Sequence, residues 1–269
     1  MVNPSMELSI ITVTYNSASV ISDCLSSVAS QSFKNVKHIV IDGASTDGTV
    51  EILQAHRGQL DALISEPDEG IYDALNKGVG LASGDIVGIL NSDDTFFSSD
   101  VLKEVMSVFE REPDTQIVFG NVIYSDISNP NKVLRFYSSK NFRPWKLRFG
   151  FMPAHTATFI RKSIFEHHGL YRADYESAGD FEFLVRLLIK RSVKYFYLDK
   201  TLVNMRLGGM SSSGLISYKR TTFEFIQALR ENGIYTNLFF VLLRLPIKFI
   251  CKVKFQLLFI LRRILSPNE

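Results

Sequence analysis

The chain has 269 residues, of which 46% are hydrophobic and 22% are charged, and its formal net charge at pH 7 is +2. This length and apolar content suffice for one large hydrophobic core, and they argue against a generally disordered chain. The small net charge gives no support for binding to nucleic acid.

Short apolar runs alternate with helical patterns through the first half of the chain. The runs typical of buried strands are residues 8–14, 37–42, 62–66, 85–90 and 116–124. The segments with helical spacing of apolar residues are 17–32, 49–56, 71–82 and 100–110. This alternation predicts an α/β fold with a mostly parallel central sheet flanked by helices.

The pattern is looser in the second half. The expected elements are a turn at 125–132, a strand and a helix before Gly169, a helix at 180–191, a strand and loop at 193–207, and a helical region from 216 onward. We therefore predict a main domain at 1–215, with halves at 7–124 and 125–215. Residues 216–269 then form a helical, basic-amphipathic extension.

Cysteine usage and hydropathy indicate the compartment. Cys24 and Cys251 are the only cysteines, too few for a disulfide framework or a zinc site, so a reducing compartment is expected. The start of the chain has no basic stretch followed by a long apolar core, so we expect no secretory signal. No run of about 18 apolar residues occurs, so we expect no ordinary spanning helix. These features predict a cytoplasmic protein.

Polar side chains follow three of the predicted strands. Tyr15 and Asn16 follow the first, Asp42 ends the second, and Asp93 and Asp94 follow the strand at 85–90. Ligands of open α/β sheets bind at the carboxyl ends of the strands, so these residues predict a site there. The alternative is that the three aspartates are turn or loop residues.

Phosphate recognition by a glycine loop is not supported. Neither a G-x-G-x-x-G nor a G-x-x-x-x-G-K-[ST] pattern follows any predicted strand. A divalent cation held by carboxylates also binds phosphates, and Mg²⁺ and Mn²⁺ prefer oxygen ligands. We therefore predict Mg²⁺ or Mn²⁺ as the cofactor.

Four stretches of the sequence occur together in a characteristic order. They are SIITVTYN, VIDGASTDGT, EPDEGIYDALNKGVGLASGD and ILNSDD. With their separations, they resemble the inverting glycosyltransferases of family 2 with the GT-A fold, of the type found in bacterial polysaccharide biosynthesis. The resemblance covers about residues 7–210.

The resemblance implies a nucleotide-sugar site in the first half of the chain. Its implied members are Thr14, Tyr15 and Asn16 along the nucleoside, Asp42 at the base, Asp68 and Lys77 at the nucleotide and diphosphate, Asp93 near the ribose and metal, Asp94 at the metal, and Arg206 at the diphosphate. For Lys77, a solvated helix lysine is the alternative. Asn91 stands where the family's D-x-D motif usually begins with Asp, so one carboxylate is absent.

The resemblance places the catalytic base in the second half. Asp180 in YESAGDFEFLVRLL matches the base, and Glu182 and Arg186 match the acid and the arginine that follow it. Gly179 replaces the first acid of this motif. An N-cap at Asp180 is the alternative interpretation, compatible with catalysis.

Two further residues are candidates for acceptor contacts. His155 matches a histidine near the acceptor in similar sequences, with a structural histidine as the alternative. Trp145, the only tryptophan, either stacks on a sugar or lies in the core. Residues 205–214 (MRLGGMSSSG) are typical of a mobile loop over the donor.

The tail at 234–269 carries basic residues along one face of a predicted helix. They are Arg244, Lys248, Lys252, Lys254, Arg262 and Arg263. A basic, Phe- and Leu-rich amphipathic helix fits an anionic membrane surface. The alternative is a helix packed on the enzyme's own core or in a dimer interface.

These features predict an enzyme that moves a sugar from a nucleotide-sugar to a hydroxyl of a lipid-linked or oligosaccharide acceptor at the cytoplasmic face of the membrane. A UDP-sugar is the expected donor, with a GDP-sugar as the alternative. Sugar-1-phosphate nucleotidyl transfer would need a glycine-rich basic loop after the first strand, which is missing. The remaining alternative is a membrane-associated binding module of the same fold with impaired catalysis.

Overall fold

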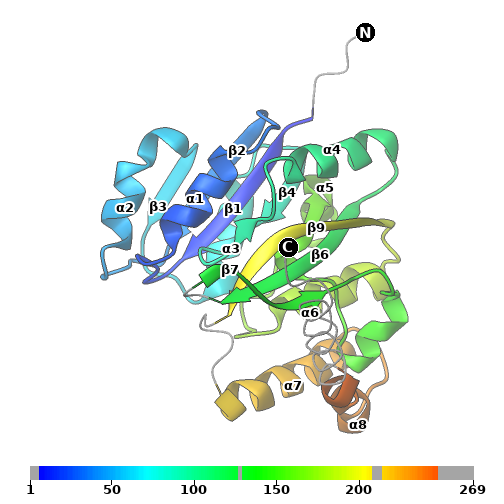
Figure 1. Cartoon of the computed structure of the whole chain (residues 1–269). Coiled ribbons are helices and arrows are strands. Elements are labelled where there is room, and N and C mark those ends of the chain that lie inside the picture. The colour runs from blue at the N-terminus through cyan, green and yellow to red at the C-terminus, as the bar shows by residue number, and fades with distance from the viewer. Residues whose placement is uncertain (1–5, 127–128, 208–213, 248–269) are drawn as a thin grey trace, which may run out of the picture.

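The structure, a computed structural model, describes residues 6–126, 129–207 and 214–247. A nine-stranded sheet runs through these residues in the order β3-β2-β1-β4-β8-β6-β9-β5, with β7 beside β6 (Figure 1). The strands are β1 Leu8–Thr14, β2 Val36–Asp42, β3 Ala62–Ser65, β4 Ile86–Ile89, β5 Thr95–Phe96, β6 Ile117–Asp126, β7 Asn129–Tyr137, β8 Thr158–Arg161 and β9 Tyr195–Leu207.

Helices connect and cover these strands. The longer ones are α1 Ile21–Ala29, α2 Thr49–Ala55, α3 Ile71–Leu81, α4 Val101–Arg111, α5 Lys162–His168, α6 Gly179–Val185, α7 Gly214–Glu231 and α8 Leu238–Leu242. Short helical turns are η1 Arg57–Gln59, η2 Pro144–Phe149, η3 His155–Ala157 and η4 Arg186–Lys190. The helix predicted at 180–191 is thus α6 followed by one π-helical turn.

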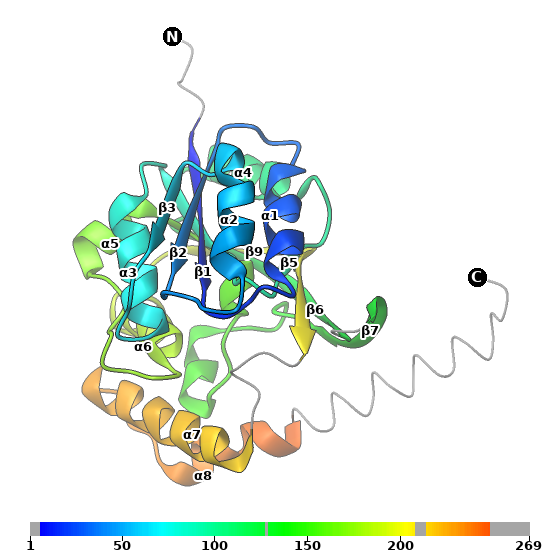
Figure 2. The same cartoon turned by 90° about the vertical axis from the view of Figure 1, so that its left-hand side faces the viewer.

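The sheet separates two hydrophobic cores. Apolar residues of α1, α2 and α4 pack together on one face, and those of α3, α5 and α6 on the other. Figure 2 shows α1 and α2 on one side of β1 and β2, and α3 on the other side. All seven residues of β1 are buried, as expected for a strand covered on both faces.

Strand direction differs between the two parts of the sheet. The strands β3, β2, β1 and β4 are parallel, whereas β8 runs antiparallel to both β4 and β6. The prediction of parallel strands therefore describes the first half, and the second half is mixed. Because β1, β2 and β4 are parallel, the loops that follow them lie at one edge.

The helices α7 and α8 pack on the second half of the fold. Among the described residues, no helix is long and apolar enough to cross a membrane. The ring of Phe225 in α7 stacks on Phe181 of α6, with centroids 3.8 Å apart. Arg244 is 2% exposed, lies over the Phe225 ring and donates to Thr222. Its assignment to a membrane-facing basic surface is therefore wrong, because it packs within the enzyme. Residues 248–269, which hold the other basic residues of that prediction, lie outside the described residues.

Candidate active site

The loop after β1 is fixed by hydrogen bonds to the loop after β2. The backbone of Asn16 lies in the left-handed region, with φ of +47°. Its amide nitrogen donates to the Ser45 hydroxyl at 2.8 Å, and its side-chain oxygen accepts from the Thr46 amide at 2.9 Å. Thr14 is buried and Tyr15 is 48% exposed. The loop therefore presents the Tyr15 ring to solvent beside the end of β2.

Asp42 is fully buried at the end of β2. Its carboxylate accepts hydrogen bonds from the amide and hydroxyl of Ser45 and from the hydroxyl of Ser65 at 2.7 Å. In this structure Asp42 fixes the loop, and its contact with a nucleotide base stays a prediction.

Asp68 and Lys77 lie close to the same edge. A Cβ atom added at Gly43 would meet Oδ2 of Asp68 at 2.6 Å, so the glycine lets this carboxylate lie against the loop in its present position. The Lys77 ammonium lies 2.9 Å from Glu66 and 3.3 Å from Asp73. These carboxylates raise the pKa of Lys77, with the hydrogen bond to Glu66 as the largest cause. Lys77 is thus held beside the loop instead of extending freely into solvent.

Asn91 to Asp94 form a turn between β4 and β5. The amide of Asp94 donates to the Asn91 carbonyl at 3.0 Å, and the Ser92 hydroxyl lies 3.0 Å from that of Ser17. Burial raises the pKa of Asp93. Burial, and then the nearby Asp93 charge, raise the pKa of Asp94 well above its usual value. Two carboxylates are therefore held in a place that disfavours their ionised forms.

The turn fits a divalent cation. Asp94 is 1% exposed, and its Oδ2 has no hydrogen-bond partner among the described residues. A buried carboxylate oxygen without a partner is costly unless a cation or a proton satisfies it. The described residues contain no cluster of three or more His, Cys, Asp or Glu side chains suited to a metal. An ion here would therefore need additional oxygen ligands beyond Asp93 and Asp94, as Mg²⁺ commonly has from water and substrate phosphate.

Arg206 lies near this acidic turn. Its guanidinium forms an ion pair with Asp23 of α1, and its side chain is 7% exposed. Its buried Nε has no hydrogen-bond partner among residues with described placement. The Arg206 charge acts on both Asp93 and Asp94, opposing the effect of burial on their pKa values. Of the mobile loop predicted at 205–214, residues 205–207 belong to β9 and Gly214 begins α7, whereas 208–213 lie outside the described residues.

Asp180 lies in the first turn of α6, whose N-cap is Ala178, so the N-cap interpretation of Asp180 is wrong. Its Oδ1 accepts a hydrogen bond of 3.1 Å from the Tyr72 hydroxyl and one of 2.8 Å from the Phe181 amide. Burial and the Asp180 charge raise the pKa of Tyr72, which keeps this phenol protonated as a donor. Tyr72 therefore orients the carboxylate while leaving its second oxygen available.

The structure explains the glycine that replaces the first acid of the motif. A Cβ atom at Gly179 would lie 2.9 Å from two atoms of the Tyr72 ring. The ring that donates to Asp180 therefore occupies the space that a side chain at position 179 would need.

A cleft of about 550 Å³ connects Asp180 with the turn after β4. Asn91, Tyr72, His155 and Asp180 all line this cleft. The His155 ring nitrogen Nε2 is 2.9 Å from the Tyr171 hydroxyl, and burial lowers the pKa of His155. His155 is thus a neutral, oriented imidazole that faces the same space as Asp180.

The two other predicted acceptor residues lie elsewhere. Glu182 is 2% exposed, and its carboxylate binds Arg186 in a bidentate ion pair and accepts from Asn232. Trp145 is 59% exposed and lines a separate, apolar cavity. Neither lines the cleft that contains Asp180, so their direct contact with an acceptor stays a prediction.

Several residues of the cleft were not predicted. Arg135, Tyr137 and Arg220 line it together with Tyr72. Tyr72 lies within EPDEGIYDAL, which belongs to one of the four stretches that carry the family resemblance. Its place in that stretch was the only feature of the sequence that could have marked Tyr72 as a site residue. Arg135 and Tyr137 follow the turn predicted at 125–132, and Arg220 lies in the region predicted to be helical from 216; none of the three belongs to a recognisable motif.

The chain is similar to a known family and to known proteins. Residues 9–169 match the family described as Glycosyl transferase family 2. A PGL/p-HBAD biosynthesis glycosyltransferase of Mycobacterium bovis is 29% identical over 216 residues, which cover 76% of this chain and 79% of that protein. An uncharacterized glycosyltransferase of Mycobacterium tuberculosis is 29% identical over 66% of this chain and 68% of its own length.

Solved structures share the fold. TarS 1–349 of S. aureus, in complex with UDP-GlcNAc, has a TM-score of 0.65 and 19% identity over 84% of this chain. The mannosyltransferase PcManGT of Pyrobaculum calidifontis, in complex with GDP-Man and Mn²⁺, has a TM-score of 0.61 and 19% identity, again over 84%. The chain spans 65% and 64% of the length of these two proteins. The predicted GT-A fold is therefore confirmed.

Proposed function

Because the chain belongs to glycosyl transferase family 2 and has the GT-A fold, we propose that it transfers a sugar from a nucleotide-sugar to an acceptor hydroxyl with inversion. The observation that carries this proposal is a single cleft that is lined both by Asn91 of the acidic turn and by Asp180. A donor diphosphate near the turn would place the sugar between the turn and the carboxylate. The glycosyltransferase prediction is confirmed at the level of the family.

We propose Asp180 as the catalytic base. The hydrogen bonds from Tyr72 and the Phe181 amide hold one oxygen, and the other is available to take the proton of the acceptor hydroxyl as that oxygen attacks C1 of the sugar. Attack from the face opposite the leaving group inverts the anomeric centre. Glu182, through its ion pair with Arg186 of the following helical turn, acts as a positioning residue for α6.

The leaving nucleoside diphosphate gains negative charge as the bond to the sugar breaks. Lys77 and Arg206 are the cations proposed to offset it, with Thr14, Tyr15, Asn16, Asp42 and Asp68 along the nucleotide. Asp93 and Asp94 would hold Mg²⁺ or Mn²⁺, and a bound ion supplies further charge neutralisation on the diphosphate. The Mn²⁺ in the PcManGT complex supports this assignment.

The chemical classes of the donor and the acceptor are also part of the proposal. UDP-GlcNAc and GDP-Man in the two similar structures support a nucleotide-sugar, and we take a UDP-sugar as the first candidate. The acceptor is proposed to be a lipid-linked or oligosaccharide hydroxyl in the synthesis of a cell-surface polysaccharide, with the enzyme peripheral at the cytoplasmic face of the membrane.

A thermal-shift screen of UDP- and GDP-sugars, with Mn²⁺ and with excess chelator, tests the donor site. A bound donor stabilises the folded state according to its concentration relative to Kd, by about 2.7 kcal/mol at a hundredfold excess. Asp180→Asn should keep this shift and lose release of nucleoside diphosphate in the presence of acceptor. A wild-type protein that shifts with the donor but never releases nucleoside diphosphate would favour the catalytically impaired module. Absence of any shift would contradict the proposed donor site.

A further inference from the structure

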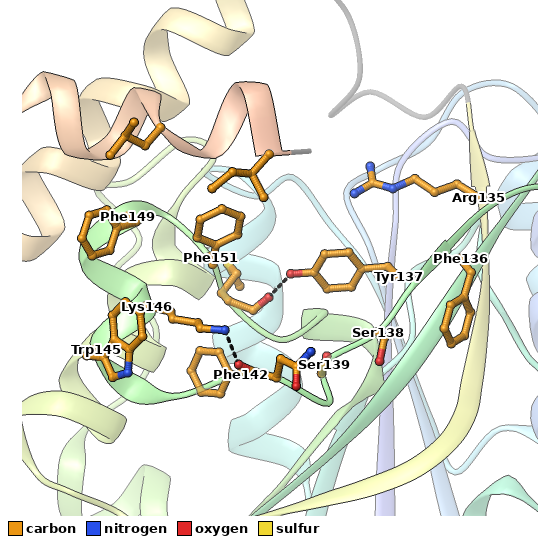
Figure 3. A pocket seen from close by; sticks show the side chains of 14 residues that line it. Arg135, Phe136, Tyr137, Ser138, Ser139, Phe142, Trp145, Lys146, Phe149 and Phe151 are labelled. Carbon is orange, nitrogen blue, oxygen red and sulfur yellow. Dashed lines mark hydrogen bonds between the residues drawn. The ribbon is translucent and has the colours of Figure 1, made fainter. Parts of the chain in front are cut away.

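A second cavity, of about 640 Å³, lies between β7, η2 and the end of α8 (Figure 3). This volume is within the roughly 300–1,000 Å³ of small-molecule sites. Aromatic and aliphatic side chains dominate its wall. They are Phe136, Tyr137, Phe142, Trp145, Phe149, Phe151, Met152, Leu243 and Ile247.

The wall of this cavity exposes large apolar groups to water. Trp145 is 59% exposed, Ile247 46% and Phe136 40%. The Trp145 and Phe149 rings meet edge to face with centroids 5.9 Å apart, so the aromatic wall is an ordered arrangement. Contiguous exposed apolar surface of this kind marks a binding site more often than a free surface.

The cavity adjoins the cleft of Asp180. Arg135, Tyr137 and Met152 line both spaces. The Tyr137 hydroxyl donates to the Met152 carbonyl at 2.6 Å, which fixes the shared wall, and the bond is drawn in Figure 3. A ligand with its reactive group at Asp180 therefore has an apolar space beside it.

Cations lie where the two spaces meet and along the second one. The Arg135 guanidinium lies 5.3 Å and 5.6 Å from the ring centroids of Tyr124 and Tyr137. The Lys146 ammonium lies 5.7 Å from the Trp145 ring centroid. The 14 lining residues include no carboxylate. The charge of the cavity thus suits an anionic group attached to a hydrocarbon chain.

We propose that this cavity binds the hydrocarbon chain of the acceptor, and that Arg135 binds an anionic phosphate between that chain and the hydroxyl-bearing group at Asp180. The inference rests on the proposed function, because it makes the second cavity part of the acceptor site. It deepens that function by selecting a lipid-linked acceptor over a free oligosaccharide.

The only tryptophan of the chain makes the test direct. Trp145 lines the cavity, so its fluorescence reports on the occupant without requiring turnover. Titration of the full-length enzyme with farnesyl phosphate should shift the emission to shorter wavelength and reduce quenching by acrylamide. Farnesol should bind about tenfold more weakly, because it lacks the charge for Arg135. Inorganic phosphate alone should cause no shift.

Two substitutions, one after α8 and one in its first turn, distinguish binding inside the cavity from adsorption to the surface. Ile247→Asp puts a carboxylate into the apolar wall and should weaken farnesyl phosphate binding by about tenfold or more. Phe239→Asp is the matched control, because Phe239 is 68% exposed and does not line the cavity. Circular dichroism should show both variants folded. Arg135→Gln should remove the preference for farnesyl phosphate over farnesol.

Three outcomes would overturn the inference. They are an unchanged Trp145 spectrum, equal affinity of the Ile247→Asp and Phe239→Asp variants, and a response only after removal of 248–269, which would make the chain's own end the occupant. Donor binding is measured separately by thermal shift. A protein that binds a nucleotide-sugar but not farnesyl phosphate retains the proposed function and contradicts only this inference.

Discussion

The Tyr72 hydroxyl donates a hydrogen bond to Oδ1 of Asp180 across 3.1 Å, and so joins the first turn of α3 to the first turn of α6. Tyr72 belongs to the half of the chain that carries the proposed donor site, and Asp180 to the half that carries the proposed base. The same Tyr72 ring packs against Gly179. One aromatic residue therefore sets both the orientation of Asp180 and the residue type that precedes it.

Replacing Tyr72 by Phe should lower kcat about fivefold and leave the KM for the donor unchanged. The change removes one hydrogen bond, worth about 1 kcal/mol, from an oriented carboxylate without altering the ring. Steady-state kinetics with saturating donor measure the effect. Tyr235→Phe is the control, because Tyr235 is 70% exposed on the surface. A rise in the donor KM with unchanged kcat would contradict a role for Tyr72 at Asp180.

Replacing Gly179 by Ala should destabilise the enzyme by about 1–3 kcal/mol, because the new methyl group collides with the Tyr72 ring in a packed region. Denaturant unfolding measures this change. Gly80→Ala is the matched control in α3, since a Cβ atom there would meet nothing within 4 Å apart from its chain neighbours and the backbone of its own helix. That control should be neutral or stabilising by up to about 1 kcal/mol.

A double-mutant cycle identifies the cause of the Gly179 effect. In a Tyr72→Leu background the ring is gone, so Gly179→Ala should cost much less than in the wild type. If the two costs simply add, the collision with Tyr72 is not the reason for glycine at this position.

The acidic turn should make stability depend on pH in a specific direction. The pKa of Asp94 in the folded protein lies well above 3.8, so the folded state binds the proton more tightly than the unfolded state. The free energy of unfolding should therefore fall as pH rises from about 3.8 through the folded pKa. In chelator, Asp94→Asn should raise Tm at pH 7.5 by about 2–4 °C for each kcal/mol recovered, and the difference should vanish near pH 4.

A divalent cation should make the wild type more stable than the Asp94→Asn variant, the opposite of the result expected in chelator. With Mn²⁺ and a nucleoside diphosphate at pH 7.5, the wild type should gain stability that the Asp94→Asn variant lacks. Asp114→Asn is the control for charge alone, because the Asp114 side chain is 82% exposed. Parallel Tm curves for wild type and Asp94→Asn across pH, with and without Mn²⁺, would exclude the turn as the cation site.

The first half of the fold was predictable because each of its strands and helices has its own period. The segment 8–14 coincides with β1, 71–82 ends one residue after α3, and 100–110 differs from α4 by one residue at each end. The second half depends on pairing between distant segments, which periodicity does not encode. The two-residue strand β5 and the turn η2 have no local pattern, and 193–207 proved to be almost entirely strand.

The site divides in a similar way. Ordered motifs predict Asp93, Asp94 and Asp180 as site residues together with the family; the family is confirmed, and the roles of these three residues stay predictions. The hydrogen bond from Tyr72 to Asp180 and the ion pair from Arg206 to Asp23 join residues 108 and 183 positions apart. No sequence rule predicts such pairs without the fold. Arg244 was wrongly predicted to face a membrane, whereas it packs on Phe225 of α7. A helical wheel shows which residues share a face of a helix, but it does not show whether another helix covers that face.

The end of the chain should carry membrane association separately from the catalytic body. Arg244 stacks on Phe225 and donates to Thr222, so a deletion that begins at residue 236 would expose packed surface and confuse two effects. Deleting only 248–269 should leave Tm within about 2 °C of the wild type while removing several basic residues and the Phe- and Leu-rich segment. Sedimentation with vesicles of anionic and of neutral lipids measures association.

The full-length protein should sediment with anionic vesicles and lose most of that association at high salt, since each Lys or Arg near such a surface contributes about 1 kcal/mol. A full-length variant with Lys248, Lys252, Lys254, Arg262 and Arg263 changed to Gln is the matched control, because it keeps the length and the apolar residues. If the deletion sediments as well as the full chain, the extension is not the membrane contact. If the deletion variant does not sediment with the vesicles while the Gln variant still does, insertion of apolar side chains, and not charge, holds the enzyme at the surface.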